Sequence, residues 1–289
     1  MPLYREFCSI EEIDKQYNVA HQIDDFTPYI ETNNSHSRYM LENVDCDLDI
    51  KYGLGQDESI DIYPSSKTGS PVLIFIHGGY WHSLDRKDFS FVAAGPLAND
   101  ITVMVVDYSL CPKVNIEDIT KQNQGAIEWI YHQAERFNGD QNKIFVAGHS
   151  AGAQQVAMML DTPWQPEFNL PDNIIKGGIA ISGIYDLTPL QHSWLQPVLN
   201  LTPAMIKQQS PLLNNGANLV PLLISYGVKE SEEFHRQSIA YHERKLAQGN
   251  DVSLLPLIDE DHLSVVQGLY DPNSLLCIAC VNFINKLTR

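Results

Sequence analysis

The sequence has few positive charges and no long apolar run. Lys and Arg number 19 against 36 Asp and Glu, a formal net charge of −17 with His neutral. Because nucleic acids and anionic membrane faces are bound by basic surfaces, this balance argues against both as partners. No apolar stretch reaches about 18 residues, and the N-terminus lacks the basic start and apolar core of a secretory leader. We therefore expect a folded, cytoplasmic protein.

The cysteines are too few and too scattered for a disulfide framework. There are five in 289 residues, an odd number without regular spacing. Cys277 and Cys280 form one pair in an apolar stretch, with no second Cys or His pair at metal-ligand spacing. We interpret them as buried thiols of a C-terminal helix and expect no metal and no cofactor.

The chain also lacks internal repeats and a Gly- or Pro-rich linker, which indicates one domain over residues 1–289. Apolar runs and helical patterns alternate after an N-terminal arm at 1–45. This order predicts an α/β fold with a mostly parallel central sheet and helices on both faces. Strands are expected near 47–52, 59–63, 71–76, 101–106, 143–147, 177–181, 220–225 and 252–255, and helices at 86–98, 116–137, 150–160, 232–247 and the C-terminus.

One interval, at about 183–219, interrupts this alternation. It is rich in Pro, Leu and Trp, and we expect two short helices that form a small lid over the sheet; an ordinary large crossover is the alternative. The arm at 1–45 is expected to pack either over the functional site of its own chain or against a partner subunit. A homodimer is therefore one possible assembly.

The segment Gly148-His-Ser-Ala-Gly152 directly follows the expected strand at 143–147 and begins a helical pattern. A strand, a G-x-S-x-G pentapeptide and a helix in this order are typical of a nucleophile elbow. Ser150 is expected in a strained turn, with glycines two positions away on each side because the backbone is crowded there. The alternative is a serine that only caps the helix.

A second glycine motif, His77-Gly78-Gly79-Tyr80-Trp81, follows the fully apolar strand at 71–76. Consecutive glycines expose backbone amides, and an oxyanion hole is built from such amides. We expect the amides of Gly79 and of Tyr80 or Gly78 to act with that of Ala151, which begins the helix after Ser150. His77 is expected to brace the loop. The alternative for the whole glycine motif is a tight turn that binds no ligand.

A serine nucleophile needs a base and an acid that orients the base. His262 follows the last expected strand, where this fold places its histidine. Glu230, just after the strand at 220–225, is the preferred acid, and Asp186 is the alternative. Asp259 and Asp261 are too close to His262 in sequence to orient it easily.

These motifs together carry a family resemblance. From about residue 47 onward the chain resembles the α/β-hydrolase superfamily, its hormone-sensitive-lipase-like branch, and within that branch the cofactor-independent kynurenine formamidases. The strings that match are His77 to Trp81, Gly148 to Gly152, Ser182-Gly-Ile-Tyr-Asp-Leu187, Ser210-Pro-Leu-Leu213, Glu233-Phe-His-Arg-Gln-Ser238 and Asp261-His262. The resemblance implies hydrolysis of N-formylkynurenine by a Ser, Asp, His triad without a metal; here Glu230 stands where the family has Asp.

The expected activity is therefore removal of a small acyl group, formyl above all, from an aryl amide. Tyr80, Trp81 and Tyr185 are the aromatic residues expected to bind this small-molecule substrate. A short-chain carboxylesterase uses the same groups and is the alternative. A non-catalytic binding protein is a further alternative, and it would be expected to have lost Ser150 or His262.

Overall fold

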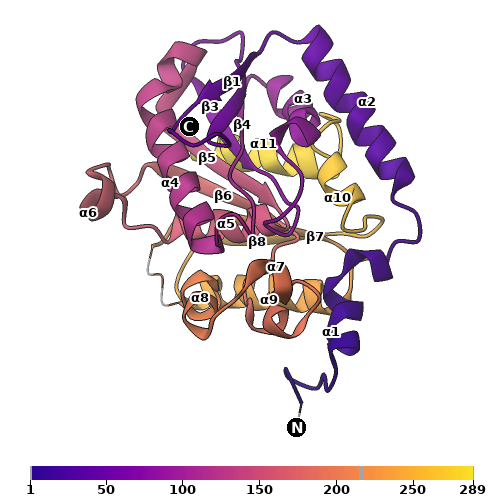
Figure 1. The fold of residues 1–289 in the computed structure, drawn as a ribbon. Helices are drawn as coiled ribbons and strands as arrows, with labels where there is room; N and C mark the ends of the chain where they lie inside the picture. The colour runs from indigo at the N-terminus through magenta and orange to yellow at the C-terminus, as the bar shows by residue number, and fades with distance from the viewer. Residues whose placement is uncertain (1, 215, 217, 289) are drawn as a thin grey trace.

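A twisted eight-stranded sheet runs through the molecule, in the order β1-β2-β4-β3-β5-β6-β7-β8 (Figure 1). The computed structural model describes residues 2–214, 216 and 218–288. Strands β3 to β8 are mutually parallel, whereas β2 pairs antiparallel with both β1 and β4. The strands are β1 Asp47–Lys51, β2 Ser59–Tyr63, β3 Ser70–Ile76, β4 Thr102–Val106, β5 Gly139–His149, β6 Ile175–Ile181, β7 Leu222–Gly227 and β8 Val252–Leu257. The prediction of a mostly parallel sheet is confirmed.

Central strand β3 shows why the sheet is covered on both faces. Alternate side chains of a strand point to opposite faces. Ile74 and Ile76 pack into one buried cluster with residues of α4 and α5, while Leu73 and Phe75 pack into a second cluster with residues of η2 and α11. A strand buried on both faces has to be apolar at every position, which explains the uninterrupted run at 71–76.

The helices divide between these two clusters. The first face carries α1 Ile10–Tyr17, α4 Ile116–Gln133, α5 Ala151–Leu160 and α9 Glu232–Ala247; the second carries α2 Thr27–Asn43, η2 Arg86–Ala93, α3 Ala94–Leu97, α10 Ser264–Gln267 and α11 Leu275–Leu287. The remaining helices are η1 Val19–His21, η3 Ala134–Phe137, α6 Trp164–Phe168, η4 Thr188–His192, α7 Gln196–Leu199 and α8 Pro203–Gln209. In the described part of the chain, no helix is both long and apolar enough to cross a membrane.

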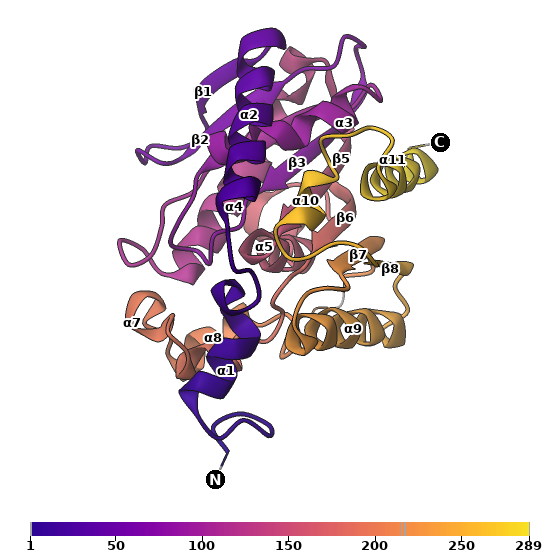
Figure 2. The same cartoon turned by 90° about the vertical axis from the view of Figure 1, so that its right-hand side faces the viewer.

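The N-terminal arm is held against the domain and does not extend from it. Figure 2 shows α1 beside α9, and α2 running from above α1 to the opposite end of the molecule. Tyr17 is fully buried, and its hydroxyl donates to Glu233 Oε2 of α9 at 2.5 Å. Ser37 Oγ of α2 accepts from the Phe91 amide of η2. The arm therefore spans both layers of helices and crosses the carboxyl end of the sheet between them.

Candidate active site

Ser150 lies at the junction of β5 and α5, at the carboxyl edge of the sheet. Its backbone has φ 56° and ψ −118°, which L-residues rarely adopt, and its amide donates to Ile181 O at 2.8 Å. A Cβ on Gly148 would lie 2.5 Å from the backbone of Gly152, and one on Gly152 would lie 2.0 Å from Ile76 O. The structure thus gives the steric reason why glycine flanks the serine on both sides.

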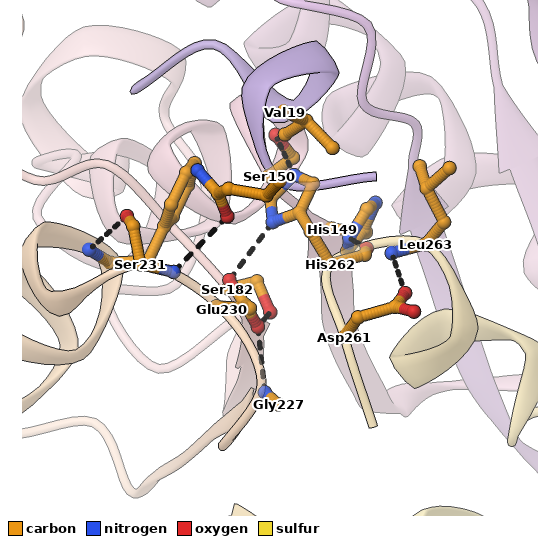
Figure 3. A network of polar contacts seen from close by, with 12 residues as sticks. Val19, His149, Ser150, Ser182, Gly227, Glu230, Ser231, Asp261, His262 and Leu263 are labelled. Carbon is orange, nitrogen blue, oxygen red and sulfur yellow. Dashed lines mark hydrogen bonds and ion pairs between the residues drawn. The ribbon is translucent and has the colours of Figure 1, made fainter. Parts of the chain in front are cut away.

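His262 brings the serine and a carboxylate together (Figure 3). It lies in the loop after β8, with Nε2 3.0 Å from Ser150 Oγ and Nδ1 2.9 Å from Glu230 Oε2. All three residues are buried. These distances are those of hydrogen bonds, so one continuous path joins carboxylate, imidazole and hydroxyl.

Glu230 is fixed in the turn after β7 by contacts to its other oxygen. Oε1 accepts from Ser182 Oγ at 2.5 Å and from the Gly227 amide at 2.6 Å, which leaves Oε2 for the histidine. A buried carboxylate needs such partners, because an unpaired charge in a dry environment is costly. Two fixed donors therefore set which oxygen faces His262.

The two other carboxylates considered from the sequence have different partners. Asp186 accepts from the Tyr4 hydroxyl at 2.9 Å and from the Thr188 amide at 2.9 Å, and within the described residues it makes no hydrogen bond to His262. Asp261 accepts from the amides of Leu263 and Ser264 and from the Tyr29 hydroxyl. Of the candidates, Glu230 is the one that the structure places on the imidazole.

The loop after β3 carries the backbone amides expected to hold an oxyanion. Gly79, Tyr80 and Trp81 have φ values of 109°, 51° and 60°, three left-handed residues in succession. Within the described residues, the amides of Gly79 and Tyr80 have no hydrogen-bond acceptor. A Cβ on Gly78 would lie 3.2 Å from that of Ser150, so this loop passes close to the serine. Ala151 opens α5, where an amide has no partner within its own helix.

His77 is buried under this loop and does not reach the serine. Its Nδ1 lies 2.7 Å from Gly78 O, its Nε2 lies 3.3 Å from Asp107 Oδ1, and its ring stacks on Tyr108. These contacts on three sides fix the ring at the base of the glycine loop. They agree with a bracing role for His77.

Ser150 and His262 open into a cavity of about 340 Å³. Its walls are mostly apolar or aromatic, with a few polar side chains. The lining residues are Val19, Phe26, Tyr29, Ile30, Asn33, Asn34, Gly79, Tyr80, Ser83, Leu84, Asp88, Phe89, His149, Ser150, His262, Leu263 and Val266. This volume lies within the usual range for sites that bind small molecules, about 300 to 1,000 Å³.

Of the three aromatic residues expected to bind substrate, only Tyr80 lines the cavity. Trp81 is fully buried and donates from Nε1 to Gln154 Oε1 at 3.1 Å. Tyr185 is also fully buried and stacks on Tyr241 with ring centroids 4.2 Å apart. Contrary to the expectation from the sequence, both side chains point into the core, because each has a buried partner there.

The N-terminal arm supplies the missing wall, at Val19 and at the face of α2 from Phe26 to Asn34. It is attached to residues beside the site at three places. The Tyr80 hydroxyl donates to Tyr17 O, Ser231 Oγ donates to Gln16 O, and the Tyr29 hydroxyl donates to Asp261 Oδ2. Because Ser231 and Asp261 are the neighbours of Glu230 and His262, the arm packs over the site itself.

The segment at 183–219, expected as a lid, takes a supporting position instead. It contains η4, α7 and α8, but none of its described residues lines the cavity. Its Trp194 packs edge-on against Tyr80, with centroids 5.3 Å apart, and its amide donates to Asp14 of α1. The segment therefore braces the arm and the glycine loop from behind.

His149 is a site residue that reading the sequence missed. Its Nε2 lies 2.9 Å from His262 O, and its ring lines the cavity beside Ser150. Burial, followed by the proximity of His262, holds the pKa of His149 well below its usual value, so this ring is neutral at pH 7. The sequence did contain a signal for this role, because His149 directly precedes Ser150 in the G-x-S-x-G motif.

The described residues contain no group of three or more His, Cys, Asp or Glu side chains arranged to hold a metal ion. Cys277 and Cys280 are buried free thiols on α11. Burial raises the pKa of the Cys277 thiol to about 11, which keeps it protonated at neutral pH.

Comparison with known proteins gives the family. The BD-FAE family model matches residues 60–244. The chain is also 30% identical over 246 residues to kynurenine formamidase of Danio rerio, across 83% of this chain and 82% of the relative. The chain belongs to the BD-FAE family. This BD-FAE protein is a hydrolase of the α/β-hydrolase fold, as its relatives and its sheet show.

Two further likenesses extend the comparison. The BD-FAE protein is 25% identical to esterase LipQ of Mycobacterium tuberculosis over 71% of its own length and 53% of the relative. Its fold matches the crystal structure of a candidate thioesterase from Silicibacter sp. TM1040 with a TM-score of 0.81 and 28% identity, covering 95% of this chain and 99% of the other. The proteins that this chain resembles in sequence or fold thus include a kynurenine formamidase, an esterase and a candidate thioesterase.

Proposed function

We propose that this protein is a serine hydrolase that removes the formyl group from an aryl formamide such as N-formylkynurenine. The observation that carries the proposal is the hydrogen-bonded path from Ser150 through His262 to Glu230, opening on an aromatic cavity. The kynurenine formamidase relatives support the choice of substrate.

In the proposed mechanism, Ser150 Oγ attacks the formyl carbon while its proton passes to His262 Nε2. Glu230 holds the proton on Nδ1 and stabilises the imidazolium that forms. The tetrahedral intermediate collapses when His262 returns the proton to the aniline nitrogen and the C–N bond breaks. Water, deprotonated by His262, then cleaves the formyl ester, which releases formate and restores the serine.

The glycine loop would stabilise the negative charge of both tetrahedral intermediates. The unpaired amides of Gly79 and Tyr80, with Gly78 close by and the amide of Ala151 across from them, form the proposed oxyanion hole. The left-handed conformations fix these amides before substrate arrives. Fixed donors require no reorganisation during the reaction, which is why such sites are effective.

The cavity fits an aryl leaving group. Phe26, Phe89 and Tyr80 provide aromatic contact surface, and the hydroxyl of Tyr80 is held by the arm. Burying an aromatic ring among such residues contributes apolar contact and favourable ring packing. A formyl group demands little space on the acyl side, where Gly78 approaches Ser150 closely.

A short-chain carboxylesterase is the second candidate, because the esterase LipQ is a relative and the cavity is largely apolar. The two functions are separated by measuring kcat/KM for N-formylkynurenine and for p-nitrophenyl acetate with the same preparation. We expect the formamide to be the better substrate, although the ester is intrinsically more reactive. A higher kcat/KM for the ester would favour the esterase.

Two controls complete this assay. Ser150→Ala should abolish turnover of both substrates, which assigns the activity to this site. Absence of turnover in the unmodified protein, with correct folding and with a broad set of formamides and esters, would support a non-catalytic binding protein.

A further inference from the structure

The cavity has a second polar region, on the wall where α2 packs on η2. Ser37 Oγ of α2 donates to Asp88 O of η2 at 3.4 Å, and the Phe91 amide donates to Ser37 Oγ at 3.3 Å. Residues three or four apart share one face of a helix, so Asn33 and Asn34 lie on the same face as Ser37. Asp88 and both asparagines line the cavity. This wall therefore combines one carboxylate with two amides.

The charge of the cavity is one-sided. Among the described residues that line it, Asp88 is the single carboxylate, and none is Lys or Arg. His149 is neutral because burial lowers its pKa. Asp88 Oδ2 accepts from the Asp85 amide at 3.0 Å, whereas Oδ1 has no hydrogen bond or ion pair within the described chain.

Asp88 thus lacks the cation that a partly buried carboxylate would favour. Burial, more than any other influence, raises the pKa of Asp88 above its usual value. A positively charged group bound at Oδ1 would offset this cost with a charge-assisted hydrogen bond.

We propose that Asp88 binds the ammonium group of the substrate, so that the enzyme selects aryl formamides with a cationic side chain. The inference rests on the proposed function, and N-formylkynurenine carries such a group. The carboxylate of N-formylkynurenine would meet only uncharged donors in this cavity. One of them is Asn33, whose Oδ1 accepts from Gln267 Nε2, so that its Nδ2 is free to donate to the substrate. The ammonium is therefore the charge that this cavity recognises more strongly.

The kinetic test compares N-formylkynurenine with its des-amino analogue, which keeps the formanilide, the ketone and the carboxylate. In the unmodified enzyme, kcat/KM should be at least about tenfold higher for N-formylkynurenine, as is typical of a hydrogen bond between charged groups. Asp88→Asn should reduce this ratio to near one, mainly through KM. The des-carboxy analogue, which keeps the ammonium, should retain most of the advantage.

Asp85→Asn is the matched control. It removes the same charge from the same element, on an exposed residue outside the cavity, and Asn can keep the cap on Lys87. The ratio between the two substrates should stay within about twofold of the unmodified enzyme, since Asp85 does not line the cavity. An equal fall of the ratio in both variants would show a long-range charge effect and overturn the assignment.

A binding measurement keeps the test independent of turnover. Calorimetry with Ser150→Ala should show L-kynurenine binding at least about tenfold more tightly than des-amino kynurenine, and Ser150→Ala/Asp88→Asn should lose that preference. Equal affinities in Ser150→Ala would overturn the proposal for Asp88. Preference for the ammonium without hydrolysis of N-formylkynurenine by the unmodified protein would refute the proposed function alone.

Discussion

Glu230→Gln tests the proposed catalytic path while preserving the outline of the side chain. Ser182 Oγ and the Gly227 amide both donate to Oε1, so the glutamine oxygen has to remain there. The amide NH₂ then faces His262 Nδ1, which lies 2.9 Å from Oε2 in the unmodified protein. Because an NH₂ group only donates, Nδ1 has to become an acceptor.

This change places the imidazole proton on Nε2, where it points at Ser150 Oγ, 3.0 Å away. The histidine then holds the wrong tautomer and cannot take the serine proton. In serine proteases the equivalent substitution lowers kcat about 10⁴-fold, and we expect a similar loss here, about 5 kcal/mol of transition-state stabilisation.

The assay is kcat for N-formylkynurenine at neutral pH, with circular dichroism and thermal unfolding to show that the variant is folded. Glu230→Asp should lose less, since it keeps the charge and withdraws it by about 1.5 Å, one carbon–carbon bond. Asp186→Asn is the matched control and should keep kcat within about threefold. A loss below tenfold in Glu230→Gln, or a larger loss in Asp186→Asn, would refute the reasoning.

Two further predictions concern the arm and the elbow. Burial tends to raise the pKa of Asp261, but the hydrogen bonds from the Tyr29 hydroxyl and from the residues after Asp261 lower this pKa overall. Removing the hydroxyl in Tyr29→Phe should therefore reduce the free energy of unfolding by about 1 kcal/mol. Urea unfolding should show this difference above pH 4 and its disappearance as pH falls through the folded pKa of Asp261; a pH-independent difference would contradict it. Gly152→Ala, whose Cβ would lie 2.0 Å from Ile76 O, should lower Tm strongly, whereas Gly125→Ala in α4, with nothing within 4 Å, should raise it slightly.

Much of the sheet could be predicted from the sequence because its strands are buried on both faces. The apolar run at 71–76 became β3, and the helix expected at 232–247 has those bounds as α9. Helix α6, Trp164–Phe168, was not predicted, since five residues around a proline carry no helical period. The antiparallel pairing of β1 and β2 was also missed, because alternation indicates a strand but not its direction.

The polar part of the site was predictable because each candidate directly follows a strand. Ser150, Glu230 and His262 come after β5, β7 and β8, and the carboxyl ends of parallel strands meet at one edge of a sheet. The choice between Glu230 and Asp186 needed coordinates, since both follow neighbouring strands.

The walls of the cavity were not predictable, for two physical reasons. Contacts such as Tyr29 to Asp261 join residues 232 positions apart, and no local pattern indicates them. An aromatic residue beside a motif can point either way; Trp81 turned inward because Gln154 on α5 offers its indole a buried acceptor.

The central claim is that Ser150 is the nucleophile of an acyl-transfer site, and peptide mass spectrometry after inactivation tests it most directly. A serine-directed fluorophosphonate should add one phosphonyl group, on the peptide that contains Ser150, in proportion to the loss of N-formylkynurenine hydrolysis. Ser150→Ala should take up no label. Labelling of a different residue, or full activity in protein labelled completely at Ser150, would contradict the account.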